Sequence, residues 1–104
     1  MSDKRLLFLE KLVADGKADA FARYALALEY AGRERIDDAV TAFEGLRAHD
    51  ATYVPMYLMA GQVLAKAGRN DAARAWLEEG VVAAKKKGDS HALGEIQGVL
   101  ATLG

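Results

Sequence analysis

Residues 30–39, YAGRERIDDA, and residues 64–73, LAKAGRNDAA, give the clearest indication of the fold of this 104-residue chain. Each stretch contains the end of an apolar helical segment, a Gly-Arg turn and an acidic start to a second segment. Ala39 and Ala73 lie 34 positions apart. At the same offset, apolar residues of similar size correspond: Tyr30 with Leu64, Ala27 with Gly61, and Phe43 with Leu77. A repeated packing environment would require this correspondence, so the chain is predicted to be a repeat protein.

The repeat resembles the tetratricopeptide repeat (TPR) family. That family's 34-residue pattern is Trp-x2-Leu-Gly-x2-Tyr, then Ala-x3-Phe, then Pro. Residues 20–53 and 54–87 follow it in one unbroken register. The matching positions are Leu26, Ala27, Tyr30, Ala39 and Phe43, then Tyr57, Ala60, Gly61, Leu64, Ala73 and Leu77. The chain departs from the pattern at Arg23, where the family has its aromatic residue, and at Ala51 and Lys85, which replace the closing proline.

The resemblance implies an all-α fold, with antiparallel helical hairpins stacked in a short right-handed superhelix. The composition agrees, because helix-forming residues dominate and there is one proline. We expect one domain over 1–104, with a half repeat at 3–14 and a capping helix at 89–103. The six predicted helices span about 3–14, 19–31, 36–49, 53–67, 70–87 and 89–103.

Four glycines carry specific expectations. Glycine inside a helix costs about 1 kcal/mol relative to alanine, so Gly61 and Gly80 need a packing reason, which close helix crossing would supply. Gly32 and Gly68 lie at predicted helix ends, where we expect each to adopt the left-handed conformation that terminates a helix. Asp37, Asp38 and Asp71 would then fall in the first turn of the following helix, where negative charge is favoured.

The composition excludes several classes of function. A net charge of −1, from 14 basic and 15 acidic residues, disfavours nucleic-acid binding. The absence of cysteine removes thiolate catalysis and cysteine-zinc sites. No run of about 18 apolar residues indicates a membrane span, and the first residues do not read as a secretory signal. We therefore expect a cytoplasmic protein that needs no cofactor or metal and binds neither nucleic acid nor membrane.

Catalytic constellations are also absent from the pattern. The adjacent pairs Asp37-Asp38 and Glu78-Glu79 do not face each other on a helix, so neither is a carboxylate dyad. His91 and Glu95 are one helical turn apart and could form one side of a metal site, but a site needs further ligands. A small metal-dependent or regulatory enzyme domain is the weakest hypothesis, and we predict that the chain is not an enzyme.

The resemblance implies that the first helix of each repeat lines a concave groove that binds a peptide or partner protein. In the helix at 19–31, the residues at 21, 24 and 28 form an apolar stripe opposite the packing stripe of Leu26, Ala27 and Tyr30. Such a stripe is often core, but this helix already has a packing face, so we favour a largely apolar binding surface. The predicted partner-binding residues are Phe21, Tyr24, Leu28, Leu58, Met59, Gln62, Lys66 and His91.

The alternative function is self-association. The helix at 3–14 carries more apolar residues than one neighbour can cover, which leaves Leu7 and Phe8 as candidates for a homodimer interface. A rival possibility is that the N-terminal segment folds over its own neighbour and hides these side chains.

Overall fold

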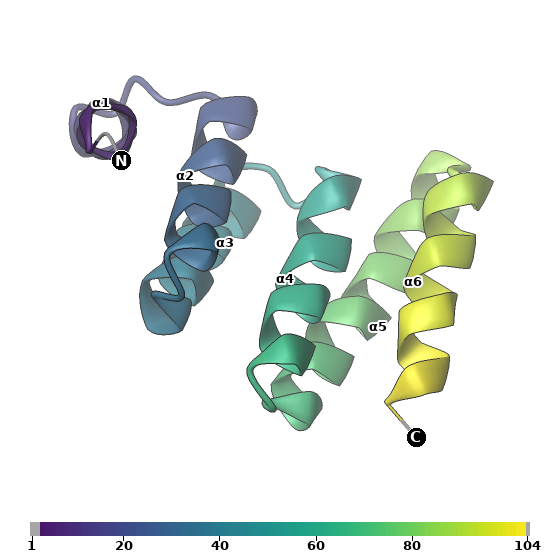
Figure 1. The fold of residues 1–104 in the computed structure, drawn as a ribbon. Helices are drawn as coiled ribbons and strands as arrows, with labels where there is room; N and C mark the ends of the chain where they lie inside the picture. The colour runs from purple at the N-terminus through teal and green to yellow at the C-terminus, as the bar shows by residue number, and fades with distance from the viewer. Residues whose placement is uncertain (1–2, 104) are drawn as a thin grey trace. The chain divides into compact units, whose positions relative to one another are not determined.

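The computed structural model describes residues 3–103, and within that range it consists of six α-helices and no strand. The helices are α1 (Lys4–Ala14), α2 (Ala20–Gly32), α3 (Ile36–His49), α4 (Val54–Lys66), α5 (Asn70–Lys87) and α6 (Ser90–Thr102). Each bound lies within one residue of its prediction. The expected all-α helical-repeat fold is confirmed, with α2 paired to α3 and α4 paired to α5 (Figure 1).

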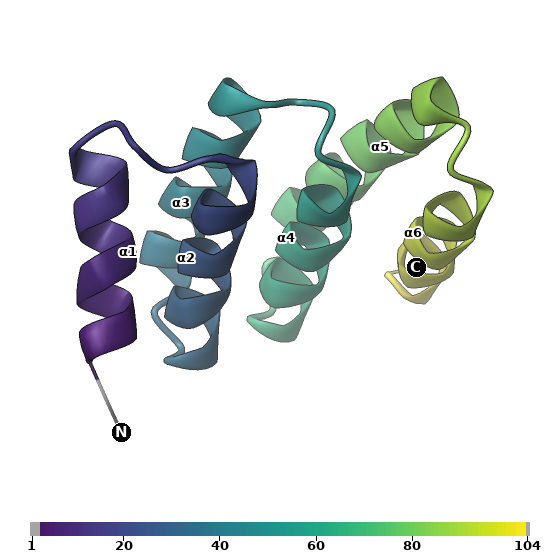
Figure 2. The same ribbon diagram turned by 90° about the horizontal axis from the view of Figure 1, so that it is seen from above.

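The chain forms two compact units. The first ends at Asp50 and contains α1, α2 and α3; the second begins at Ala51 and contains α4, α5 and α6. In the first unit α1 lies beside α2 (Figure 2), and in the second α6 packs on both α4 and α5. The interpretation of 1–104 as a single folding domain stays a prediction.

Four helices end in the same way, with a left-handed residue just after the helix. In the second repeat this residue is Gly68, at φ 80°, whose N–H donates to the Ala65 carbonyl at 3.0 Å. The N–H of Arg69 donates to the Leu64 carbonyl at 2.8 Å, which completes the paired hydrogen bonds of a Schellman motif. The left-handed residues of the four motifs are Gly16, Glu34, Gly68 and Gly88.

The expectation for Gly32 was wrong. Gly32 is the last residue of α2, and Glu34 takes the left-handed position at φ 60°. The physical reason lies in the repeat register, because Glu34, not Gly32, is 34 positions before Gly68. The two Gly-Arg pairs are therefore not equivalent, and a residue with a side chain adopts a conformation that costs it roughly 1–2 kcal/mol.

The starts of the helices follow expectation more closely. Asp37 and Asp38 lie in the first turn of α3 and Asp71 in that of α5. Two other helices have side-chain caps: Asp19 accepts a hydrogen bond from the N–H of Ala22, and Asp89 accepts one from that of Ala92, at 2.8 and 3.0 Å. These carboxylates satisfy N–H groups that have no partner within the helix.

The packing confirms the 34-residue correspondence. Ala39 and Ala73 are both fully buried, as are Phe43 and Leu77. Small residues thus lie at equivalent helix contacts and large ones fill equivalent spaces in each repeat.

Gly61 and Gly80 have the packing reason that the sequence required. A Cβ added at Gly61 would lie 2.4 Å from two side-chain carbons of Leu77, and one added at Gly80 would lie 2.6 Å from the Cβ of Tyr57. Carbon atoms in contact are normally about 3.5–4.0 Å apart. Hydrogen in place of a side chain therefore lets α4 and α5 approach closely.

Candidate partner-binding surfaces

The apolar stripe predicted on α2 lies at the surface of the first unit. Phe21 is 67% exposed, while Tyr24 and Leu28 are half-buried. The three side chains line a hollow of about 200 Å³ together with Arg5 of α1 and Glu29 of α2. The structure therefore brings the three predicted residues together, and it adds a charged edge that the sequence did not indicate.

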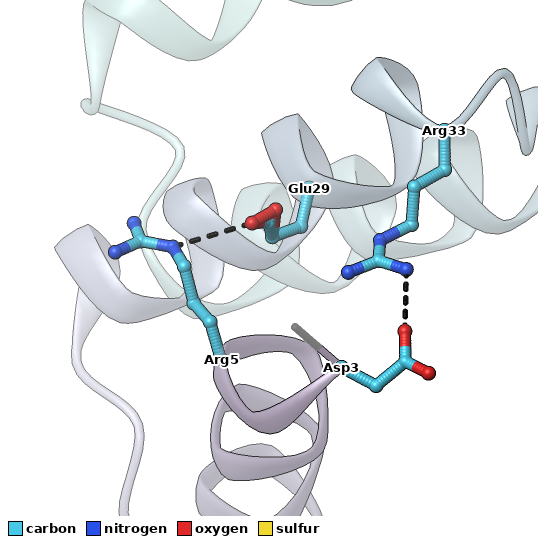
Figure 3. A network of polar contacts seen from close by, with 4 residues as sticks. All are labelled: Asp3, Arg5, Glu29 and Arg33. Carbon is cyan, nitrogen blue, oxygen red and sulfur yellow. Dashed lines mark hydrogen bonds and ion pairs between the residues drawn. The ribbon is translucent and has the colours of Figure 1, made fainter. Parts of the chain in front are cut away.

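Two ion pairs hold α1 against α2 beside this hollow (Figure 3). Arg5 Nε lies 3.4 Å from Glu29 Oε1, and Arg33 Nη1 lies 2.8 Å from Asp3 Oδ1. Exposed ion pairs contribute little stability each, about 0–1 kcal/mol, so their main effect is to set how α1 is oriented. The burial of Leu6 and Leu9 against α2 supplies the larger attraction.

A third polar contact between α1 and α2 joins the Tyr30 hydroxyl, as donor, to the carboxylate of Glu10. Burial first, then this hydrogen bond and the charge of Glu10, raise the pKa of Tyr30 from 10.0 to about 12, against the opposing effect of the Arg35 guanidinium 4.7 Å above its ring. The folded state thus holds the phenol proton more tightly than the unfolded chain does. The resulting stability is fully present below pH 10 and is lost as the pH rises from about 10 to about 12.

The predicted partner-binding residues on α4 differ in their exposure to solvent. Gln62 and Lys66 are exposed and Met59 is half-buried. Leu58 packs partly against the core of the second unit, next to Val54 and others. Because α6 packs against α4, the Leu58 side chain is partly used in the core of the second unit. It therefore offers less surface to a partner than the sequence suggested.

His91 is exposed near the start of α6, and its Nε2 lies 3.2 Å from Glu95 Oε1. Within residues 3–103, no group of three or more His, Cys, Asp or Glu side chains is arranged to hold a metal ion. This pair by itself gives at most two ligands, whereas a metal site needs further ones.

On α1 the two predicted self-association residues are exposed, Leu7 by 61% and Phe8 by 63%. The described part of the N-terminal segment does not hide them, so the rival possibility of an intrachain cover was wrong. Self-association itself stays a prediction.

Two larger hollows were missed by the sequence reasoning. One, of about 420 Å³, lies in the first unit and includes Arg23 and Tyr30. The other, of about 440 Å³, lies in the second unit beside Val82, Lys86 and Lys87. A signal for the second was present in the sequence, because the helix predicted at 70–87 is longer than its hairpin partner predicted at 53–67.

The repeat and its packing agree with a comparison against known families, in which residues 18–94 match the tetratricopeptide repeat. The chain belongs to the TPR family. The resemblance read from Tyr30, Ala39 and their counterparts is thereby confirmed. TPR domains generally mediate protein–protein interactions and are typically non-catalytic scaffolds.

Solved structures show the same TPR fold. A protein from Bordetella parapertussis, studied in solution, is 29% identical, with a TM-score of 0.82 over 99% of this chain and 89% of that one. A tetratricopeptide repeat domain protein from Salinibacter ruber is 30% identical: its crystal structure has a TM-score of 0.73 over 83% of this chain and 96% of that one. A solution structure from the same organism has a TM-score of 0.75, at 30% identity, over 82% and 86%. No curated protein matches the chain. None of the helices described is long and apolar enough to cross a membrane.

Proposed function

We propose that this TPR protein is a non-catalytic interaction module that holds an apolar segment of a peptide or partner protein on the outward stripe of α2. The observation that carries the proposal is the hollow lined by Phe21, Tyr24 and Leu28. An aromatic ring that is 67% exposed beside two half-buried apolar side chains is the kind of patch that marks interaction sites. Aromatic residues also dominate the binding energy of protein interfaces.

The charged edge of the hollow would fix the orientation of the bound segment. Arg5 and Glu29 are paired with each other, so neither charge is left uncompensated. Arg5 can still donate a hydrogen bond to a main-chain carbonyl of the partner, and Glu29 can still accept one from a main-chain N–H. On the second unit, partner contacts are proposed separately, through the exposed and half-buried residues Met59, Gln62, Lys66 and His91, with a smaller share from Leu58.

The test introduces a negative charge at apolar positions of the α2 stripe. Phe21→Glu and Leu28→Glu should abolish capture of the specific partner from the native cell, measured by affinity purification and quantitative mass spectrometry. Ala48→Glu, which places the same charge on an exposed position of α3, is the matched control and should retain it. Far-ultraviolet circular dichroism must show intact helices in all three. Partner capture that survives Phe21→Glu in a folded protein would contradict the proposal.

A second candidate function, homodimer formation through α1, is favoured by the exposure of Leu7 and Phe8. Burying each such side chain contributes about 1.5–3 kcal/mol. A two-fold interface counts each contact twice. Sedimentation equilibrium of the wild type should then show a dimer that Phe8→Glu dissociates and Ala14→Glu, on the same helix, does not. A wild type that stays monomeric at high protein concentration would refute this alternative.

A further inference from the structure

The hairpin of the second unit is built from helices of unequal length. α4 has 13 residues and α5 has 18. At a rise of 1.5 Å per residue, the five additional residues make α5 longer by about 7 Å. Because a short turn joins the end of α4 to the start of α5, the excess falls at the opposite end, where α5 runs beside the link at Ala51 and Thr52 instead of beside α4.

This mismatch leaves the hollow of about 440 Å³, which is within the size range of ordinary ligand pockets. Tyr57 lies beneath it and is only 4% exposed. The ring is held from two sides: its hydroxyl donates to the Ala51 carbonyl at 2.6 Å, and its Cβ rests against Gly80. The ring of Trp76 lies beyond, 6.1 Å away between centroids. The hollow therefore has a rigid apolar base.

The α5 side of the hollow combines an apolar wall with charged ends. Val82 is 53% exposed, the only large apolar side chain among the exposed ones described in the second unit. Glu79, Val82 and Lys86 recur at spacings of three and four residues, so they share one face of α5. Lys87 lines the hollow as well. Neither lysine makes an ion pair within residues 3–103, whereas Glu79 has an interaction of its own.

The helix dipole accounts for lysine in the last turn of α5, but not for where these lysines lie. A cation near a helix C-terminus is favoured wherever it sits on the turn. Lys85 is in the same turn and does not line the hollow, whereas Lys86 and Lys87 both do. Two uncompensated cations beside an exposed apolar wall are complementary to a carboxylate that adjoins a large apolar side chain.

We infer that this hollow is a second docking site, which takes an acidic peptide segment by inserting one large apolar side chain over Tyr57. A carboxylate of the segment lies against Lys86 and Lys87. The site is separate from the stripe on α2, so it does not depend on the proposed function. A nucleic acid fits the hollow less well, because phosphate contacts need an extended basic surface and the chain as a whole has a charge of −1.

The probe is the capped peptide acetyl-Glu-Glu-Phe-Glu-Glu-amide, titrated to about 1 mM into the full isotope-labelled chain while amide chemical shifts are followed by NMR. We expect saturable shifts centred on Val82 and Lys86. Binding should weaken about threefold for Lys86→Ala and for Lys87→Ala, as is usual for one exposed charge pair. It should also weaken when ionic strength is raised from about 0.1 M to about 1 M.

Lys85→Ala is the matched control, because it removes the same charge from the same turn without altering the lining, and it should leave binding unchanged. Peptides with Gln in place of Glu, or Ala in place of Phe, should bind at least threefold more weakly. The inference is overturned if no saturable shift appears, if Lys85→Ala weakens binding as much as Lys86→Ala, or if the Gln peptide binds equally well. It is also overturned if a short DNA oligonucleotide shifts these amides and the peptide does not. Shifts centred on Phe21 and Tyr24 would support the proposed function and contradict this second site.

Discussion

A single methyl group added at Gly80 tests how closely α4 and α5 approach. In Gly80→Ala, the new Cβ would lie 2.6 Å from the Cβ of Tyr57 and 3.1 Å from Cδ1 of Ile96. The first of these atoms is bonded directly to the backbone of α4, so it cannot rotate away. The hairpin would have to open by about 1 Å to restore a normal carbon contact of about 3.5 Å.

The magnitude follows from two opposing contributions. Overpacking of this kind costs about 1–3 kcal/mol. Alanine gains back about 0.5–1 kcal/mol in a helix, because glycine loses more conformational freedom on folding. We therefore expect Gly80→Ala to lower the free energy of unfolding by about 1–2 kcal/mol.

Gly94→Ala on α6 is the matched control. It is the same chemical change inside a helix, but an added Cβ there would have no atom within 4 Å. Only the gain in helix propensity remains, so this variant should be more stable than the wild type by about 0.5–1 kcal/mol. The two variants should differ by about 1.5–3 kcal/mol, which corresponds to roughly 6–24 °C in Tm for a domain of this size.

The assay is thermal and urea unfolding followed by far-ultraviolet circular dichroism. Both variants must show native helical content at low temperature, so that the comparison concerns stability. A rise in Tm for Gly80→Ala equal to that for Gly94→Ala would refute the argument that glycine is required by the α4–α5 contact.

Four further predictions follow from the structure. Ala39→Leu, at a fully buried helix contact, should cost about 1–3 kcal/mol in unfolding experiments, whereas Ala65→Leu on the more open α4 surface should be nearly silent; equal losses would contradict the repeat register. Tyr30→Phe should remove the loss of folding stability that the wild type shows between about pH 10 and pH 12, because the folded state favours the protonated phenol; an unchanged pH dependence of unfolding would argue against it. Glu34→Gly should raise Tm slightly by relieving the left-handed conformation at φ 60°, and a clear fall would show that this conformation is not strained. Zinc and chelator should leave Tm unchanged, and a zinc-dependent rise lost in His91→Ala would overturn the metal-free interpretation.

The sequence by itself was sufficient for the fold and for every helix, because local signals recur along the chain. Apolar residues at helical spacing, acidic first turns and the 34-residue correspondence of Ala39 with Ala73 are short-range or periodic patterns. Glycine inside a helix, as at Gly61 and Gly80, indicated close packing before any contact was known. The exposure of Leu7 and Phe8 was also predictable, since a helix with one neighbour can cover only one stripe.

The positions of the surface hollows follow from how the helices pack, which the sequence pattern does not contain. The polar edge at Arg5 and Glu29 depends on how α1 is oriented against α2, which no periodicity encodes. The share of Leu58 in the core depends on α6 lying along α4. The basic hollow beside Lys86 arises because α5 is longer than α4. The difference in length leaves a hollow only once the two helices lie side by side in the folded chain. Sequence patterns specify which face of a helix is apolar. Whether a neighbouring helix covers that face depends on how the helices pack.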